Sequence, residues 1–252
     1  MNSINKKIKA LTQQIKEYYK LLFYKNDISK LAWFYGTDKE GIHFYSKHYQ
    51  NHFEKYKNKK INLLEIGVGG YEDSTKGGES LRMWNKYFKR GKIYGIDLYD
   101  KTNANSKRIV TYIGDQTNET FLRKIVNEIG GVDIIIDDGS HINEQVIKSF
   151  KILFPLLNVN GIYVIEDLQT SYWDIIDGIH FGGSNDPKSE FTSMFFLKSL
   201  IDCLNYEEFN IKNYSPTYFD KHIVSIHFYH NIVFIYKGIN NEGSNIIQRS
   251  SS

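Results

Sequence analysis

Ile134-Ile135-Ile136-Asp137-Asp138-Gly139-Ser140-His141 is the stretch that decides the fold. About thirty residues later, Ile162-Tyr163-Val164-Ile165-Glu166-Asp167 repeats the pattern of an apolar run that ends in two carboxylates. Short runs of β-branched residues closed by polar residues and glycine are typical of strands buried on both faces of a parallel sheet. The sequence therefore predicts an α/β fold built on a parallel sheet.

The acids at the two strand ends are expected over one crevice, because ligands of open α/β sheets bind outside the carboxyl ends of the strands. These acids are Asp137, Asp138, Glu166 and Asp167. Carboxylates crowded in this way repel one another, and they stay charged together when a cation lies among them. Hard oxygen ligands suit Mg²⁺ or Mn²⁺ better than zinc. His141 lies a turn beyond Asp138, which places an imidazole beside that cation as a candidate base.

The composition describes one large globular domain. The chain has 252 residues, of which 41% are hydrophobic and 15% aromatic, enough to bury a core. A net charge of +3 without a long basic block gives no sign of nucleic-acid binding. The single cysteine, Cys203, excludes an internal disulfide framework and fits a reducing compartment. No apolar stretch reaches the roughly 18 residues of a membrane span and no signal-peptide pattern opens the chain, so we expect a cytoplasmic protein.

A further strand and turn precede these stretches, in Asn62-Leu63-Leu64-Glu65-Ile66-Gly67-Val68-Gly69-Gly70. Its glycines permit positive φ and a close approach of the backbone to a ligand. The dinucleotide fingerprint needs a third glycine where this sequence has Glu72, which argues against NAD. The next two predicted strands end in Asp97 and in Asp115-Gln116, where an acid can accept hydrogen bonds from ribose and the following pair can meet an adenine edge.

This spaced series of strand ends resembles the class I methyltransferase fold, in which such positions meet the methionine part, the ribose and the adenine of S-adenosylmethionine. The resemblance implies a Rossmann-like α/β fold with a seven-stranded, mostly parallel sheet, and S-adenosylmethionine as cofactor. An unrelated doubly wound domain with ordinary acidic strand ends is the alternative. The expected cofactor-binding residues are Glu65, Gly67, Gly69, Asp97, Asp115, Gln116, Asp137 and Thr37.

Other segments are expected around the sheet. Apolar residues recur at three- and four-residue spacing over residues 4–22, which predicts an amphipathic helix packed on the domain or on a partner subunit. The turn Tyr35-Gly36-Thr37-Asp38-Lys39 either caps the next helix or folds over a bound ligand. Ser140 is expected to cap a helix over residues 141–156. Residues 223–228 and 232–236 predict a C-terminal antiparallel hairpin.

These segments suggest three parts of the chain. We expect residues 1–57 to form an N-terminal helical segment and residues 58–239 to form the methyltransferase domain. Residues 240–252 are polar and serine-rich, which predicts a disordered tail.

Four motifs together resemble the metal-dependent sugar O-methyltransferases of macrolide biosynthesis, the mycinamicin and demethylmacrocin O-methyltransferase family. The motifs lie at residues 64–70, 78–84, 137–141 and 165–173, and the similarity covers about residues 35–237. The resemblance implies that Asp138, Glu166 and Asp167 hold Mg²⁺ or Mn²⁺ and that His141 is the general base. Asp137 is assigned to support. Members of that family carry a larger N-terminal domain that helps form a tetramer. This chain has the helix over residues 4–22 in its place, so that quaternary structure is not carried over and a homo-oligomer is left as an open expectation.

The expected activity is metal-dependent transfer of a methyl group from S-adenosylmethionine to a sugar hydroxyl. Resemblance to compact relatives in bacterial surface-polysaccharide pathways implies a nucleotide-linked sugar, such as a heptose for a capsule, as the acceptor. A catechol or another small diol is the main alternative, because it would use the same cation geometry. A nucleic-acid methyltransferase is disfavoured by Gly139-Ser140-His141 after the fourth strand. A non-catalytic binding module is disfavoured because it has no need of the base and the three metal-binding acids.

Overall fold

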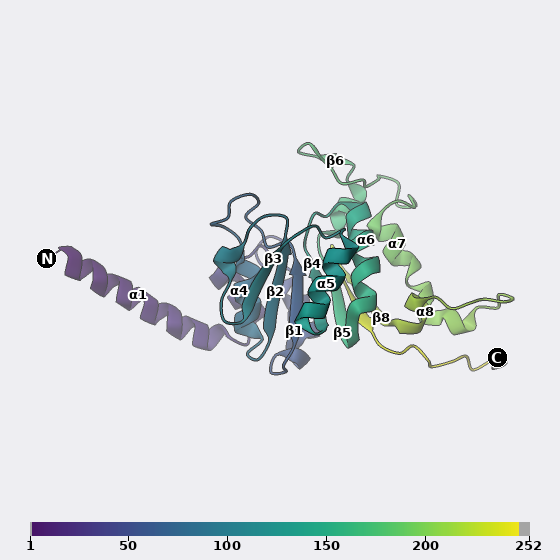
Figure 1. Cartoon of the computed structure of the whole chain (residues 1–252), viewed down its shortest axis with the longest axis horizontal. Coiled ribbons are helices and arrows are strands. Elements are labelled where there is room, and N and C mark those ends of the chain that lie inside the picture. Colours follow the sequence, from purple (N-terminus) through teal and green to yellow (C-terminus); the bar gives the residue numbers. More distant parts are fainter. Residues whose placement is uncertain (1, 247–252) are drawn as a thin grey trace.

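The computed structural model describes residues 2–246, in which helices and strands alternate along much of the chain (Figure 1). The helices are α1 (Asn2–Tyr24), α2 (Ile28–Tyr35), α3 (Ser46–Phe53), α4 (Glu79–Tyr87), α5 (Glu119–Ile129), α6 (Asn143–Leu153), α7 (Ser193–Ser199) and α8 (Tyr218–His222). The strands are β1 (Asn62–Ile66), β2 (Lys92–Asp97), β3 (Ile109–Ile113), β4 (Val132–Asp137), β5 (Leu157–Ile165), β6 (Ile175–Ile176), β7 (Ile179–His180), β8 (Ile223–Tyr229) and β9 (Ile232–Lys237). Among the described residues, no helix has the length and apolar character needed to cross a membrane.

Seven strands form one sheet in the order β3-β2-β1-β4-β5-β9-β8. Strands β1 to β5 pair in parallel, whereas β9 pairs antiparallel with both β5 and β8. The strand order reverses between β1 and β4, which is where open α/β sheets bind their ligands. The predicted mostly parallel sheet of seven strands with a C-terminal antiparallel hairpin is thereby confirmed.

The alternation of side chains along each strand divides the core into two layers. Leu63 and Ile134 pack in the layer with α2, α3 and α4, whereas Leu64 and Ile135 pack in the layer with α5 and α6. All four side chains are fully buried. Two consecutive acids at the end of a strand therefore leave the sheet toward opposite layers.

The N-terminal helices α2 and α3 share the core of the sheet, because Leu31, Tyr49 and Phe53 are buried in the same cluster as the strand residues. Helix α1 confirms the helix predicted over residues 4–22, and it extends away from the sheet (Figure 1). The boundary predicted at residue 57 stays a prediction, although residues on both sides of it lie in one core.

One local prediction differs from the structure, and another extends beyond the described residues. Helix α6 begins at Asn143, and its N-cap residue is Ile142, which makes no side-chain cap. Ser140 was expected in that role, but His141 has a φ of +57°, and this left-handed residue separates Ser140 from the helix. Of the tail predicted over residues 240–252, residues 247–252 lie outside the described residues. Asn240 donates hydrogen bonds to the carbonyl oxygens of Cys203 and Asp220, so the chain is held at that point.

His52 is a titratable group inside the aromatic part of the core. Its ring stacks on Phe234 with 4.1 Å between centroids. Its two nitrogens lie 2.7 Å from the Tyr236 hydroxyl and 3.0 Å from the Tyr229 hydroxyl. Burial, with added repulsion from neighbouring positive charge, lowers the pKa of His52 from 6.5 to about 4. The folded protein therefore resists protonation at this position.

We expect the free energy of unfolding to decrease as the pH falls from about 6.5 to about 4. In this window the unfolded chain binds a proton that the folded chain excludes, so acid favours unfolding. After allowance for solvent screening, the loss should be about 1 to 2 kcal/mol. The variant His52→Gln, which does not titrate, should flatten the pH dependence measured by urea unfolding. His180→Gln, an exposed histidine on β7, is the control; equal pH slopes in His52→Gln and wild type would contradict the assignment.

Candidate active site

Strands β1 and β4 end side by side at the point where the strand order reverses. Gly67 follows β1 with a φ of +86°, and a Cβ atom there would lie 1.9 Å from the carbonyl oxygen of Asp138. Only glycine fits this approach of two backbones. Gly69 has a φ of +77°, and a Cβ atom there would meet nothing within 4 Å. One glycine of the turn is thus required by packing, and the other borders open space.

The acids after β2 and β3 accept hydrogen bonds from backbone amides. Asp97 accepts from the amide of Val68 at 2.9 Å and from that of Tyr99 at 3.0 Å, which ties the end of β2 to the glycine turn. Asp115 is exposed and accepts from the amide of Thr117 at 2.7 Å. Carboxylate oxygens have several acceptor positions, so both acids retain capacity for a ligand hydroxyl or amine.

Gln116 and Asp137 are buried together, and their side chains hydrogen-bond to other residues of this chain. Gln116 Nε2 donates to Asp137 Oδ1 at 3.3 Å, and Gln116 Oε1 accepts from the amide of Ser140 at 2.9 Å. Asp137 also accepts hydrogen bonds from Ser149 of α6 and, at 3.4 Å, from Tyr163 of β5. Burial raises the pKa of Asp137 to about 6. These contacts anchor the end of β4 to the α6 layer.

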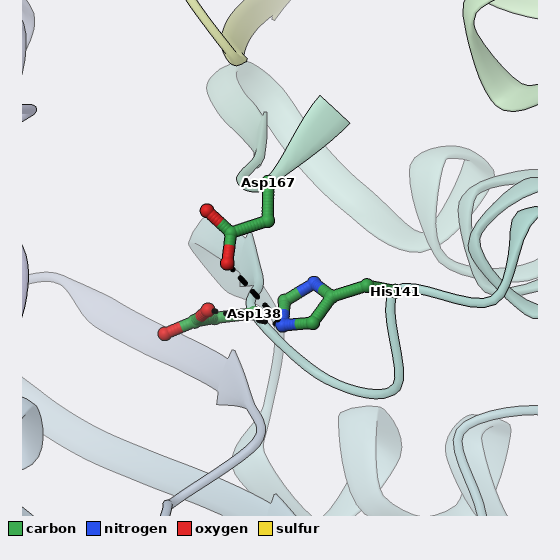
Figure 2. Close-up of side chains that lie close together, drawn as sticks. All are labelled: Asp138, His141 and Asp167. Carbon is green, nitrogen blue, oxygen red and sulfur yellow. Dashed lines mark ion pairs between the residues drawn. The ribbon is translucent and has the colours of Figure 1, made fainter. Parts of the chain in front are cut away.

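Asp138, His141 and Asp167 come together at the ends of β4 and β5 (Figure 2). His141 Nε2 lies 3.8 Å from Asp138 Oδ1 and 3.6 Å from Asp167 Oδ2. One ligand atom from each residue lies within 4.8 Å of the other two. Within the described part of the chain, this group has the spacing and the residue types to hold a metal ion.

His141 and Asp167 both have left-handed backbone conformations, with φ values of +57° and +54°. Residues other than glycine rarely adopt this conformation, and such residues concentrate at functional sites. At His141 the chain turns before α6 begins, and the imidazole points to the two carboxylates (Figure 2). The backbone thus accepts local strain at the two positions that bring these side chains together.

Glu166, the third predicted metal ligand, contacts the N-terminal segment. Its Oε1 accepts hydrogen bonds from Lys39 Nζ at 2.6 Å and from the Tyr49 hydroxyl. The same ammonium donates to Asp138 Oδ2 at 2.7 Å and lies 3.4 Å from Glu65 Oε1. Lys39 is fully buried. A single lysine therefore joins the carboxylates of three successive strands in the sheet.

Asp167 is also surrounded by two rings from the loop before α3. The Tyr45 hydroxyl donates to Asp167 Oδ1 at 2.8 Å, and His43 Nδ1 lies 3.5 Å from the same oxygen. The two rings stack on each other with 5.1 Å between centroids. Burial opposes ionisation of Asp167, but His141, His43 and the Tyr45 hydroxyl outweigh it and lower the pKa of this carboxyl. Asp167 is thus ionised at neutral pH.

Two residues predicted to bind the cofactor carry buried polar atoms that have no hydrogen-bond partner among the described residues. These atoms are Thr37 Oγ1 and Glu65 Oε1. Glu65 Oε2 accepts from Ser80 Oγ at 3.0 Å, and burial raises the pKa of Glu65 to about 7. Buried polar atoms are nearly always paired in proteins. Glu65 Oε1 has the Lys39 ammonium at 3.4 Å as an ion-pair contact, whereas Thr37 Oγ1 has no hydrogen-bond partner among the described residues; with the open space at Gly69, these atoms fit a polar ligand.

Four residues of the site were not predicted as site residues from the sequence: Lys39, His43, Tyr45 and Tyr49. The sequence left the turn before α3 open between a helix cap and a ligand contact. Charge balance was a usable signal, because crowded acids require positive charge nearby. The sequence-based prediction gave that role to a metal ion alone, whereas the structure adds a buried lysine.

Comparison with known proteins gives close relatives. No family model matches the sequence. The chain is 47% identical over 222 residues to demethylmacrocin O-methyltransferase from Streptomyces fradiae, covering 87% of this chain and 55% of that protein. It is 42% identical over 214 residues to 8-demethyl-8-α-L-rhamnosyl tetracenomycin-C 2'-O-methyltransferase from Streptomyces olivaceus, covering 84% of this chain and 55% of that protein. The chain spans about half the length of these relatives.

A solved structure is also similar. It is the MycE methyltransferase from the mycinamycin biosynthetic pathway in complex with Mg and SAH, with a TM-score of 0.83 and 46% sequence identity. The match covers 89% of this chain and 57% of that chain. The predicted Rossmann-like methyltransferase fold is thereby confirmed.

Proposed function

We propose that this chain transfers a methyl group from S-adenosylmethionine to a sugar hydroxyl with the help of a divalent cation. The observation that carries the proposal is the group of Asp138, His141 and Asp167, a base and two anionic ligands at the ligand-binding edge of a methyltransferase fold. The relative named for 2'-O-methylation of a rhamnosyl group supports a sugar acceptor. The MycE complex with Mg and SAH supports both cofactors.

For S-adenosylmethionine we propose the open space at the glycine turn as the binding site. Gly69 borders open space there, and the buried Thr37 Oγ1 and Glu65 Oε1, which make no hydrogen bond among the described residues, offer polar contacts for the methionine part. Asp97 and Asp115 are proposed for the ribose and the adenine, because each follows the next strand outward from β1. We assign Gln116 and Asp137 a structural role, because their buried side chains hold the end of β4 in place.

For the cation we propose Asp138, Glu166 and Asp167 as ligands, because Mg²⁺ prefers carboxylate oxygens. A bound divalent cation would lower the pKa of a coordinated sugar hydroxyl and so help to make a nucleophile at neutral pH. His141 accepts the hydroxyl proton at Nε2. The carboxylates of Asp138 and Asp167, at 3.8 and 3.6 Å, stabilise the positive charge that the imidazole then carries.

For the acceptor we propose a sugar hydroxyl in a glycoside, as the name of the rhamnosyl tetracenomycin relative suggests. A nucleotide-linked heptose for a surface polysaccharide and a small diol are the other acceptor classes to be tested. We propose a cytoplasmic location, which a chain with a single cysteine fits. We also propose a homo-oligomer, because Leu11, Tyr18 and Phe23 of α1 are exposed apolar side chains; light scattering measures this directly.

The test of the proposed function is transfer of labelled methyl from S-adenosylmethionine to three acceptor classes, each with Mg²⁺ and with EDTA. The classes are rhamnosyl glycosides, nucleotide-linked hexoses and heptoses, and catechol. We expect transfer to a sugar with Mg²⁺ and its loss in EDTA. Transfer that survives EDTA would remove the metal from the proposal, and transfer to catechol alone would favour the small-diol alternative. S-adenosylhomocysteine should raise the unfolding temperature, whereas NAD should not.

A further inference from the structure

We propose that Lys39 is a positioning residue of this site, which orients the carboxylates of Asp138 and Glu166 for the metal ion. The inference rests on the proposed function, and it assigns a role to a side chain that comes from outside the strand ends. Lys39 lies in the turn between α2 and α3, whereas the two acids follow β4 and β5.

The groups around the Lys39 ammonium form a binding site for a positive charge. The side chain is fully buried, and its ammonium donates to Asp138 Oδ2 at 2.7 Å and to Glu166 Oε1 at 2.6 Å. Glu65 Oε1 lies 3.4 Å away on the side of the predicted cofactor crevice. Buried ion pairs are often no more stabilising than packed apolar side chains, so a buried lysine is weak evidence for stability. Its contacts with three acids of the proposed site point to a role in arranging them.

The two oxygens of the Asp138 carboxylate have different partners. Oδ2 is occupied by Lys39, and Oδ1 is the oxygen that lies 3.8 Å from His141 Nε2. Holding Oδ2 fixes the rotation of the carboxylate, so Oδ1 points into the group formed with His141 and Asp167. Metal ligands in proteins are commonly held in this way by a second hydrogen bond.

Glu166 is held in a comparable manner. The Lys39 ammonium and the Tyr49 hydroxyl both donate to its Oε1, so two donors act on one oxygen of this carboxylate. Both donors come from the N-terminal segment and both are fully buried. The N-terminal segment thus sets the orientation of two of the three proposed metal ligands before the metal ion binds.

Lys237 offers a matched control. It is a buried lysine as well, with 4% of its surface exposed, and its ammonium donates to the backbone carbonyls of Phe154, Pro155 and Leu157. These carbonyls lie in the 3-10 turn before β5 and at the first residue of β5, and Glu166 follows the opposite end of that strand. Loss of Lys237 therefore removes a buried ammonium without touching the proposed metal site.

The experiment measures the dissociation constant of Mn²⁺ by electron paramagnetic resonance, on the full chain with S-adenosylhomocysteine present. We expect Lys39→Met to raise this constant about 10-fold or more. Lys39→Gln should retain part of the affinity, because its amide still donates a hydrogen bond. Lys237→Met should bind Mn²⁺ as the wild type does, even where its unfolding temperature falls.

The sign of the effect separates positioning from simple electrostatics. Removal of a nearby positive charge should by itself favour a bound cation. Unchanged or tighter Mn²⁺ binding in Lys39→Met would therefore overturn the inference while leaving the metal site in place. If the wild type itself does not bind Mn²⁺, the metal site of the proposed function fails, and the role of Lys39 fails with it.

A measurement on the wild-type protein covers the case in which the Lys39 variants do not fold. Buried ammonium groups exchange slowly with water, so their ¹⁵N signals can be followed by nuclear magnetic resonance. Addition of Mg²⁺ should shift the signal of Lys39 and leave that of Lys237 in place. A Lys39 signal that does not move while Mg²⁺ binds would overturn the inference.

Discussion

Replacement of His141 by Asn is expected to lower the rate constant for methyl transfer by about 10² to 10⁴-fold, the range typical of a lost general base. Asn adopts the left-handed conformation more readily than most residues, so the backbone at a φ of +57° should be retained. The loss should therefore lie in proton transfer, with S-adenosylhomocysteine binding close to that of the wild type. Single-turnover transfer from labelled S-adenosylmethionine to the best acceptor measures it.

His43→Asn is the matched control for that variant. His43 contacts the same acid from the other side, at 3.5 Å from Asp167 Oδ1, and both histidine side chains are 23% exposed. The other ring nitrogen of His43 lies 3.9 Å from Asp38 and not beside Asp138, so we expect loss of His43 to reduce the rate less than about 10-fold. The opposite result would make His43 the base: a loss of about 10² to 10⁴-fold in His43→Asn, with His141→Asn still active.

The strand ends were predictable because each carries its own local signal. An apolar run followed by polar residues and glycine defines where a buried strand stops, and the residues after it must lie at the ligand edge. Alternation along β4 even separates Asp137 from Asp138, because adjacent residues point to opposite layers. Accordingly, Asp137 binds Ser149 of α6, whereas Asp138 binds Lys39.

Lys39 could not be predicted in the same way. It is separated by 99 residues from Asp138 and by 127 residues from Glu166, so no local pattern connects them. A lysine in a polar turn is usually solvated, whereas this one is fully buried where α2 and α3 pack on the sheet. His141 shows a related limit, because no residue pattern in the sequence indicates the left-handed φ that separates Ser140 from α6.

Replacement of Asp167 by Asn is expected to weaken Mg²⁺ activation by about 100-fold or more, at the upper end of the losses seen when support of a metal ligand is removed. The substitution keeps the size of the side chain, tolerates the φ of +54°, and leaves an oxygen for the Tyr45 hydroxyl. It removes the negative charge that His141 and His43 share. Titration of the transfer rate with Mg²⁺ measures the loss.

Asp133→Asn is the control for Asp167→Asn, because Asp133 is an acid of β4 that accepts from the amide of Asn62 and the side chain of Asn158. Its loss should change stability and leave the Mg²⁺ requirement unchanged. If high Mg²⁺ restores the transfer rate of Asp167→Asn, the substitution weakens metal binding. If the rate stays low at saturating Mg²⁺, the substitution acts through the lost negative charge beside the His141 imidazole. Wild-type rates at the wild-type Mg²⁺ concentration would contradict both roles and remove Asp167 from the site.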